Sequence, residues 1–188
     1  MMTMGFNLME IIETNIDGVL IIKPDVFKDD RGYFYESFSL KKFIDEGLTL
    51  NFVQDNISKS KKGTIRGLHY QVGQSVQGKL CQVISGIVLD VAVDIRFGSD
   101  SFGKYVSQIL SEDNHTQIWI PPGFAHGFAV LSDEAIFHYK CTNYYNKANE
   151  RAILYNDADI DIDWKVETPI VSEKDLKAKR FREIEKDF

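Results

Sequence analysis

The sequence predicts an all-β fold, a jelly-roll sandwich or barrel with short peripheral helices and a helical C-terminal segment. Residues 87–96, IVLDVAVDIR, alternate apolar and polar side chains with the period of two that is typical of a strand. Similar short stretches recur along the chain, separated by turns that contain Gly, Asp or Asn. Because no repeat or low-complexity linker interrupts them, residues 1–188 are predicted to form one domain, with 1–10 as a loose extension.

The elements follow one another in a regular order. Strands are predicted at 19–27, 33–38, 51–58, 64–71, 79–86, 87–96, 104–111, 116–123, 127–132 and 135–145. A short helix is predicted at 39–47, with Ser39 as its N-cap and Gly47 as its stop. Residues 172–188 are predicted to form a second helix, in which Ser172 is the N-cap and Asp175 holds the third position of a capping box.

The composition excludes several classes of protein. Hydrophobic residues make up 44% and charged residues 27%, as in ordinary globular domains. The net charge of -6 argues against binding nucleic acid or an anionic membrane. Only two cysteines occur, Cys81 and Cys141, so we expect reduced thiols. The N-terminus lacks the pattern of a signal peptide and no stretch is long enough to span a membrane, so a cytoplasmic protein is predicted.

One histidine raises the question of chemistry. His69 lies in TIRGLHYQ, residues 64–71, and three hypotheses fit it: a buried core residue, a metal ligand or a proton-transfer group. Simple alternation along this strand puts Gly67, His69 and Gln71 on one face and Arg66 on the other. Nearby cations such as Arg66 and Lys79 would favour the neutral form of His69, the form that accepts a proton.

The metal hypothesis is weakened by missing ligands. PPGFAH, residues 121–126, resembles the second metal-binding motif of cupins, with His126 as the ligand. The first cupin motif requires His-x-His followed by a glutamate, but here Gln71 replaces the second histidine and no Asp or Glu occurs between 70 and 89. We therefore predict no metal at this site.

For two other sets of residues, aspartates and tyrosines, the sequence allows two interpretations each. Asp90 and Asp94 lie opposite the aliphatic face of their strand, so they are either solvent-exposed or inside a barrel with a polar interior. The tyrosines of YKCTNYY, Tyr139, Tyr144 and Tyr145, are either ordinary strand aromatics or a proton donor and a stacking surface.

Several segments together resemble one enzyme family. DDRGYFYESF, FVQDNISKSKKGTIRGLHYQ, QGKL, LDVAVDIR, IPPGFAHGF, YKCTNYY and SEKD occur in the order and spacing of the dTDP-4-dehydrorhamnose 3,5-epimerases, from about residue 11 to 180. The resemblance implies a cofactor-independent isomerase with a metal-free jelly roll. Its substrate would be dTDP-4-dehydro-6-deoxy-D-glucose, epimerised at C3 and C5 for dTDP-L-rhamnose biosynthesis.

The resemblance also implies roles for individual residues. His69 matches the general base, Asp175 its partner, Tyr139 the general acid and Lys79 the cation at the keto oxygen. The positions that match substrate-binding residues are Arg31, Glu36, Gln54, Asp55, Asn56, Arg66, Asp90, His126, Tyr145, Glu150 and Lys174. Family members exchange N-terminal strands, which implies a homodimer in which Arg31 serves the partner's site. Ile57 and Tyr155 depart from the usual QDNHS and ILWND patterns.

Other functions are kept as alternatives. A relative could invert only C3 or only C5, or could be a 3,4-ketoisomerase of a related nucleotide sugar. A metal-dependent cupin and a non-catalytic nucleotide-sugar binding module belong to other classes. The presence of His69, Asp175 and Tyr139 together argues against the binding module, because binding alone needs no acid and base.

Overall fold

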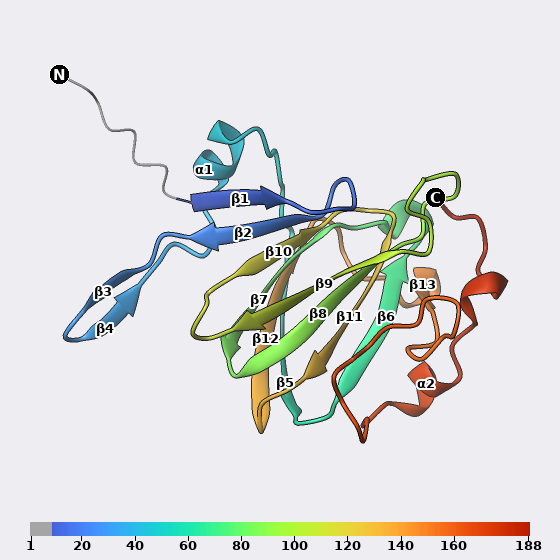
Figure 1. The fold of residues 1–188 in the computed structure, drawn as a ribbon. Coiled ribbons are helices and arrows are strands. Elements are labelled where there is room, and N and C mark those ends of the chain that lie inside the picture. The colour runs from blue at the N-terminus through green and yellow to red at the C-terminus, as the bar shows by residue number, and fades with distance from the viewer. Residues whose placement is uncertain (1–8) are drawn as a thin grey trace.

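Two antiparallel sheets form the body of the protein in the computed structural model, which describes residues 9–188 (Figure 1). The six-stranded sheet runs β1 (Met9–Glu13), β2 (Leu20–Pro24), β10 (Gln117–Ile120), β7 (Lys79–Ser85), β12 (Glu134–Cys141), β5 (Gln54–Lys61). The five-stranded sheet runs β13 (Glu150–Ala152), β6 (Ile65–Gln71), β11 (Phe124–Val130), β8 (Ile87–Asp94), β9 (Tyr105–Ser111). The predicted all-β jelly roll is confirmed.

The main core lies between the two sheets. It takes buried side chains from both of them, including Phe128 of β11 and Phe137 of β12, whose rings stack with centroids 4.2 Å apart. Val88 and Ala92 of β8 belong to this core. Asp90 and Asp94 point to the same face of β8 as Val88 and Ala92. Both aspartates are fully buried, so they lie inside the sandwich.

The opposite face of β8 is buried as well. Leu89, Val91 and Val93 pack in a second cluster with Ile160 and Trp164 from the chain that follows β13. The aliphatic face therefore does pack against another layer, yet the aspartates are not exposed, because the first sheet covers the other side. Of the two alternatives for Asp90 and Asp94, the position inside the sandwich is therefore confirmed and solvent exposure is wrong.

The C-terminal segment corrects the predicted helix over 172–188. Only α2 (Glu173–Leu176) and a 3-10 turn at Phe181–Glu183 are helical. The rest hydrogen-bonds to the body of the protein, with Leu154 N–H donating to the carbonyl of Lys179 and Phe97 N–H to that of Phe188. Apolar side chains of this segment cover the five-stranded sheet, so packing overrides helix propensity here.

Two N-terminal predictions also need adjustment. The predicted loose extension includes residues 1–8, which lie outside the described residues, but Met9 begins β1, which forms a hairpin with β2. The predicted helix at 39–47 is α1 (Leu40–Asp45); Ser39 holds the N-cap position without a side-chain hydrogen bond. Across residues 9–188, no helix is both long and apolar enough to cross a bilayer.

A small hairpin projects from the body. β3 (Phe27–Asp29) and β4 (Gly32–Phe34) pair only with each other and extend away from β6 and α2 (Figure 1). Phe27, Tyr33 and Phe34 are each more than half exposed. Such a hairpin gains little stability within its own chain, because it buries little apolar surface.

Asp94 is expected to make a large contribution to stability. It is fully buried and accepts hydrogen bonds from Arg96, Ser99 and Ser101. Burial raises its pKa, but these bonds outweigh that effect and lower the pKa from 3.8 to about 2. Because the folded pKa is depressed, the stabilisation of about 2 kcal/mol is present above pH 4 and is lost as the pH falls toward about 2.

Asp94→Asn should therefore lower the free energy of unfolding by about 3 kcal/mol at neutral pH, measured by urea denaturation. Asp29→Asn is the matched control, because Asp29 makes the same backbone and side-chain bonds to the arginine two residues on, but is exposed. Equal effects of the two substitutions would contradict this account.

Candidate active site

Side chains of the six-stranded sheet form one wall of the candidate site. Strand register aligns Cys81 of β7 with Tyr139 of β12 and Asn56 of β5, and aligns Lys79 with Cys141 and Gln54 in the next row. Cys81 belongs to the core between the sheets and Tyr139 packs against it, so these rows face the five-stranded sheet.

The opposite wall is built around two histidines. His69 of β6 lies directly opposite His126 of β11, and Arg66 lies opposite Phe128. Two residues of β6, Gly67 and Leu68, thus lie opposite one residue of β11, Gly127, so β6 has a bulge with one extra residue. Arg66 and His69 consequently share the interior face, and the prediction that Arg66 lies on the other face is wrong. Arg66 donates a hydrogen bond to Ser60 Oγ at 3.0 Å.

Gly67 makes this bulge possible. Its φ is +144°, and a Cβ there would lie 2.5 Å from the Cα of Gly127 on β11. A side chain would therefore push the two strands apart. The glycine of RGLH brings the cation of Arg66 and the ring of His69 onto one face.

His69 is paired with a buried carboxylate. Its Nε2 lies 2.7 Å from Asp175 Oδ1, although the two residues are 106 positions apart. Asp175 is 3% exposed, and Ser172 caps the short helix that presents it. Burial raises the Asp175 pKa, but the hydrogen bond and charge of His69 prevail and hold it below its usual value. The anionic carboxylate orients His69 through Nε2, which leaves Nδ1 to accept a proton.

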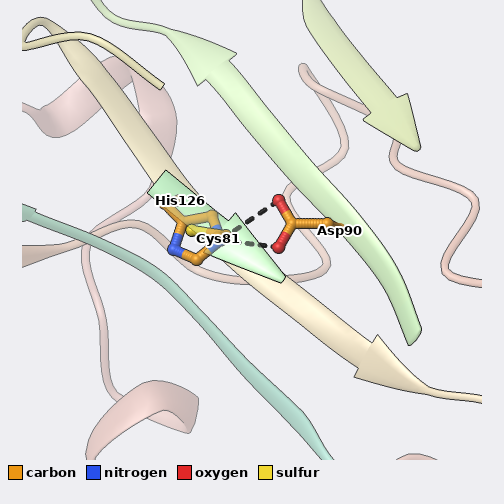
Figure 2. Close-up of side chains that lie close together, drawn as sticks. All are labelled: Cys81, Asp90 and His126. Carbon is orange, nitrogen blue, oxygen red and sulfur yellow. Dashed lines mark hydrogen bonds and ion pairs between the residues drawn. The ribbon is translucent and has the colours of Figure 1, made fainter. Parts of the chain in front are cut away.

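A second histidine–carboxylate pair lies deeper. Figure 2 shows the ring of His126 beside the carboxylate of Asp90, whose two oxygens lie 2.9 and 3.1 Å from Nε2. Burial lowers the His126 pKa, and the charge of Lys79 adds to this effect against the opposing influence of Asp90. His126 is therefore neutral at physiological pH.

Tyr139 and Lys79 supply the remaining candidate groups. Burial raises the pKa of Tyr139 to about 12, so its phenol keeps its proton over the physiological range and can donate it. Lys79 Nζ lies 3.5 Å from the carbonyl oxygen of His69. The side chains of His69 and Tyr139 start from facing sheets, so a ligand held between them would meet one on each side.

A polar network links the outer part of the site. Tyr145 donates from its backbone N–H to Gln54 Oε1 at 3.0 Å and from its hydroxyl to Glu150 Oε2 at 3.1 Å. Glu150 also forms an ion pair with Lys174. Gln54 in turn donates to Asn56 Oδ1 at 3.0 Å. This network joins β5, the loop after β12, β13 and α2, and includes five of the predicted substrate-binding residues.

An open pocket adjoins His69. Its lining includes Arg66, His69, Lys174 and Asp175, together with residues 59–61, 64–65 and 170–172. Lysines at 59 and 61 add to the positive charge of this lining. A cluster of cations beside the proposed base is suited to a phosphate-bearing ligand, despite the negative charge of the whole chain.

Three predicted substrate-binding residues lie away from the histidine pairs, the polar network and the pocket in their own chain. Arg31 pairs with Asp29 at the tip of the β3–β4 hairpin, and Glu36 forms an ion pair with Lys42 near α1. Asp55 is about half exposed and bonds to Lys140 at 3.0 Å, on the outer face of β5. Their roles remain predictions.

One neighbour of the site was missed by sequence reasoning. Cys81 Sγ lies 3.8 Å from His126 Nε2, although the sequence predicts only a reduced thiol at Cys81. The two residues come from strands in different sheets, 45 positions apart. Only the alignment of strand registers across the sandwich could have placed them together.

The comparison with protein families decides to which family this fold belongs. The family model described as dTDP-4-dehydrorhamnose 3,5-epimerase matches residues 13–183. The chain belongs to this epimerase family. The matched range includes every residue to which a catalytic or binding role was assigned.

Members of the epimerase family resemble the chain in both sequence and structure. The dTDP-4-dehydrorhamnose 3,5-epimerase of Shigella flexneri is 53% identical over 92% of this chain and 96% of its own. The Legionella pneumophila dTDP-6-deoxy-D-glucose-3,5-epimerase RmlC, solved with dTDP-4-keto-L-rhamnose, is 52% identical with a TM-score of 0.91, covering 94% and 95% of the two chains. ChmJ, a 3'-monoepimerase of Streptomyces bikiniensis, is 30% identical with a TM-score of 0.85, covering 90% and 86%.

Proposed function

We propose that this protein converts dTDP-4-dehydro-6-deoxy-D-glucose to dTDP-4-dehydro-L-rhamnose by inverting C3 and C5, in dTDP-L-rhamnose biosynthesis. The observation that carries this proposal is the pairing of His69 with buried Asp175 on one sheet and a protonated Tyr139 on the other. An inverted carbon needs a base and an acid on opposite faces of the sugar, because one group alone would return the proton to the face it left. The cationic pocket beside His69 suits the diphosphate of the substrate.

The reaction needs only proton transfers. The C4 ketone acidifies the C–H bonds at C3 and C5, so a base can remove either proton and leave an enolate. Nδ1 of His69 accepts the proton while Asp175 stabilises the resulting imidazolium through Nε2. Tyr139 then delivers a proton to the opposite face, most directly at C5. These proton transfers use no cofactor.

Lys79 stabilises the enolate in this scheme, with Arg66 in a secondary role. Lys79→Met, which keeps the length of the side chain but removes its charge, should lower kcat by about 10²-fold, as for the loss of one oxyanion-stabilising group. Lys41→Met is the control, because Lys41 is an exposed cation on α1 that is paired with Asp45 and does not line the pocket. A steady-state assay that gives Lys79→Met a raised KM and an unchanged kcat would assign Lys79 to binding instead.

The product distinguishes this proposal from its alternatives. NMR of the reaction mixture should show a 4-keto sugar with both C3 and C5 inverted. Inversion at one carbon only would identify a monoepimerase, the activity in the name of the more distant relative ChmJ. Movement of the carbonyl to C3 would identify a 3,4-ketoisomerase. The higher identity to the 3,5-epimerases favours the double inversion.

We also propose a cytoplasmic homodimer in which the β3–β4 hairpin of each chain completes the partner's site. The hairpin projects from the body away from β6 and α2 (Figure 1), and it carries exposed aromatic side chains and, in its turn, Arg31. Exposed apolar surface of this kind is typical of a protein interface. Both cysteines are free and buried, which suits a reducing compartment.

Mixed dimers test this exchange. Arg31→Ala and His69→Asn chains carrying different tags are co-expressed, and the heterodimer is purified through both tags. If Arg31 serves the partner's site, one of the two sites is intact and the heterodimer has about half of the wild-type activity. If Arg31 serves its own chain, both sites stay defective and the heterodimer is as inactive as the two parents.

A further inference from the structure

The three side chains drawn in Figure 2 come from three strands and converge inside the sandwich. Cys81 lies on β7 of one sheet, while Asp90 on β8 and His126 on β11 belong to the other. All three residues are buried, and one ligand atom from each lies within 4.8 Å of the other two. Thiolate, imidazole and carboxylate are the donors that Zn²⁺ and related transition metals prefer.

The spacing of these atoms is close to that of a metal centre. Bonds of about 2.0–2.3 Å in a tetrahedron place ligand atoms about 3.3–3.7 Å apart. His126 Nε2 lies 3.8 Å from Cys81 Sγ and 2.9 Å from the nearer oxygen of Asp90. Shifts of less than about 1 Å would therefore admit a metal ion between the three groups.

We propose that Cys81, Asp90 and His126 bind one Zn²⁺ or a similar transition metal as an inhibitory ligand of the enzyme. Binding releases the thiol proton of Cys81 and leaves Nε2 of His126 unprotonated, with the ring proton on Nδ1. The thiolate and the carboxylate then balance the two positive charges of the metal. The catalytic scheme does not use Cys81, whereas Asp90 and His126 are also among the predicted substrate-binding residues.

The charge around the cluster explains why such a metal would inhibit. His69 lies directly opposite His126 in the strand register, and Lys79 Nζ lies 3.5 Å from the carbonyl oxygen of His69. A metal ion would break the present pair of His126 and Asp90 and neutralise the negative charge that the Asp90 carboxylate places near both groups. The inhibitory role, unlike the metal binding, rests on the proposed function of His69 and Lys79.

Cobalt provides a readout that does not depend on activity. The protein, stripped with EDTA and transferred to buffer without chelator, is titrated with Co²⁺ and its absorption spectrum recorded. Wild type should show a thiolate-to-cobalt charge-transfer band and tetrahedral d–d bands that saturate at one equivalent, and Zn²⁺ should abolish both. Cys81→Val and Cys81→Ser should lose the charge-transfer band, whereas Cys141→Val, which removes the other buried cysteine, should keep it.

Deuterium exchange into the 4-keto sugar then tests inhibition. One equivalent of Zn²⁺ should remove most of the exchange in wild type and in Cys141→Val, EDTA should restore it, and Cys81→Val should exchange equally well with and without Zn²⁺. A wild-type protein without the charge-transfer band, or a band that survives in both Cys81 variants, would overturn the site. Binding with undiminished exchange would overturn the inhibitory role. Metal-free wild type without exchange would instead contradict the proposed function, and leaves the cobalt result standing.

Discussion

His69→Asn should lower the rate of proton removal at C3 and C5 by about 10²–10⁴-fold, the range typical for loss of a general base. Asparagine keeps a polar group near Asp175 but cannot accept a proton at neutral pH. The buried carboxylate would therefore keep a hydrogen-bond partner, and the fold should be preserved. The measurement is single-turnover exchange in D2O, with circular dichroism to confirm folding.

His138→Asn is the matched control for this substitution. His138 lies on β12 next to Tyr139, but alternation along the strand turns it to the outer face, where its Nδ1 lies 2.9 Å from Gln82. The control should keep near wild-type exchange. Exchange that survives in His69→Asn at the wild-type rate would assign the base to another residue, and His126 would be the first to test.

Tyr139→Phe should separate proton removal from inversion. The phenol is expected to donate the proton that completes inversion, so its loss should lower the yield of C5-inverted product by about 10²-fold or more. Deuterium should still enter the recovered substrate, because His69 can remove a proton and return a deuteron to the same face. NMR of recovered sugar and product measures both quantities in one reaction.

Tyr70→Phe controls for loss of a buried hydroxyl. Tyr70 is also a buried tyrosine whose pKa burial raises to about 12, but it belongs to the cluster on the outer side of the five-stranded sheet. It should leave inversion unchanged. If Tyr139→Phe slowed exchange and inversion equally, Tyr139 would be needed for proton removal and would not act only as the later donor.

The strand pattern predicted the architecture well because β-structure is strongly periodic here. Alternation over 87–96 correctly marked β8, and turn residues located most of the other strands. The prediction of a C-terminal helix was wrong, although this segment has helix-forming residues and a capping signal. Its aromatic side chains bury more apolar surface by covering the five-stranded sheet than they would in an isolated helix. Tertiary packing decides between helix formation and packing against a sheet, and a local sequence pattern does not contain that information.

Some features of the candidate site could likewise be predicted from the sequence, and others depend on tertiary structure. The resemblance named His69 and Asp175, and the structure places their side chains 2.7 Å apart. Alternation alone assigned Arg66 to the wrong face, because a bulge at Gly67 adds one residue to the strand. The position of Cys81 beside His126 depends on the stacking of two sheets and had no signal in the sequence.

We expect His69 and Tyr139 to move protons at two carbons of one sugar. Incubation of the protein with dTDP-4-dehydro-6-deoxy-D-glucose in D2O with EDTA, followed by NMR at C3 and C5, tests this expectation. We predict deuterium at both carbons of the product, together with inversion at both. Absence of deuterium at both carbons would contradict it.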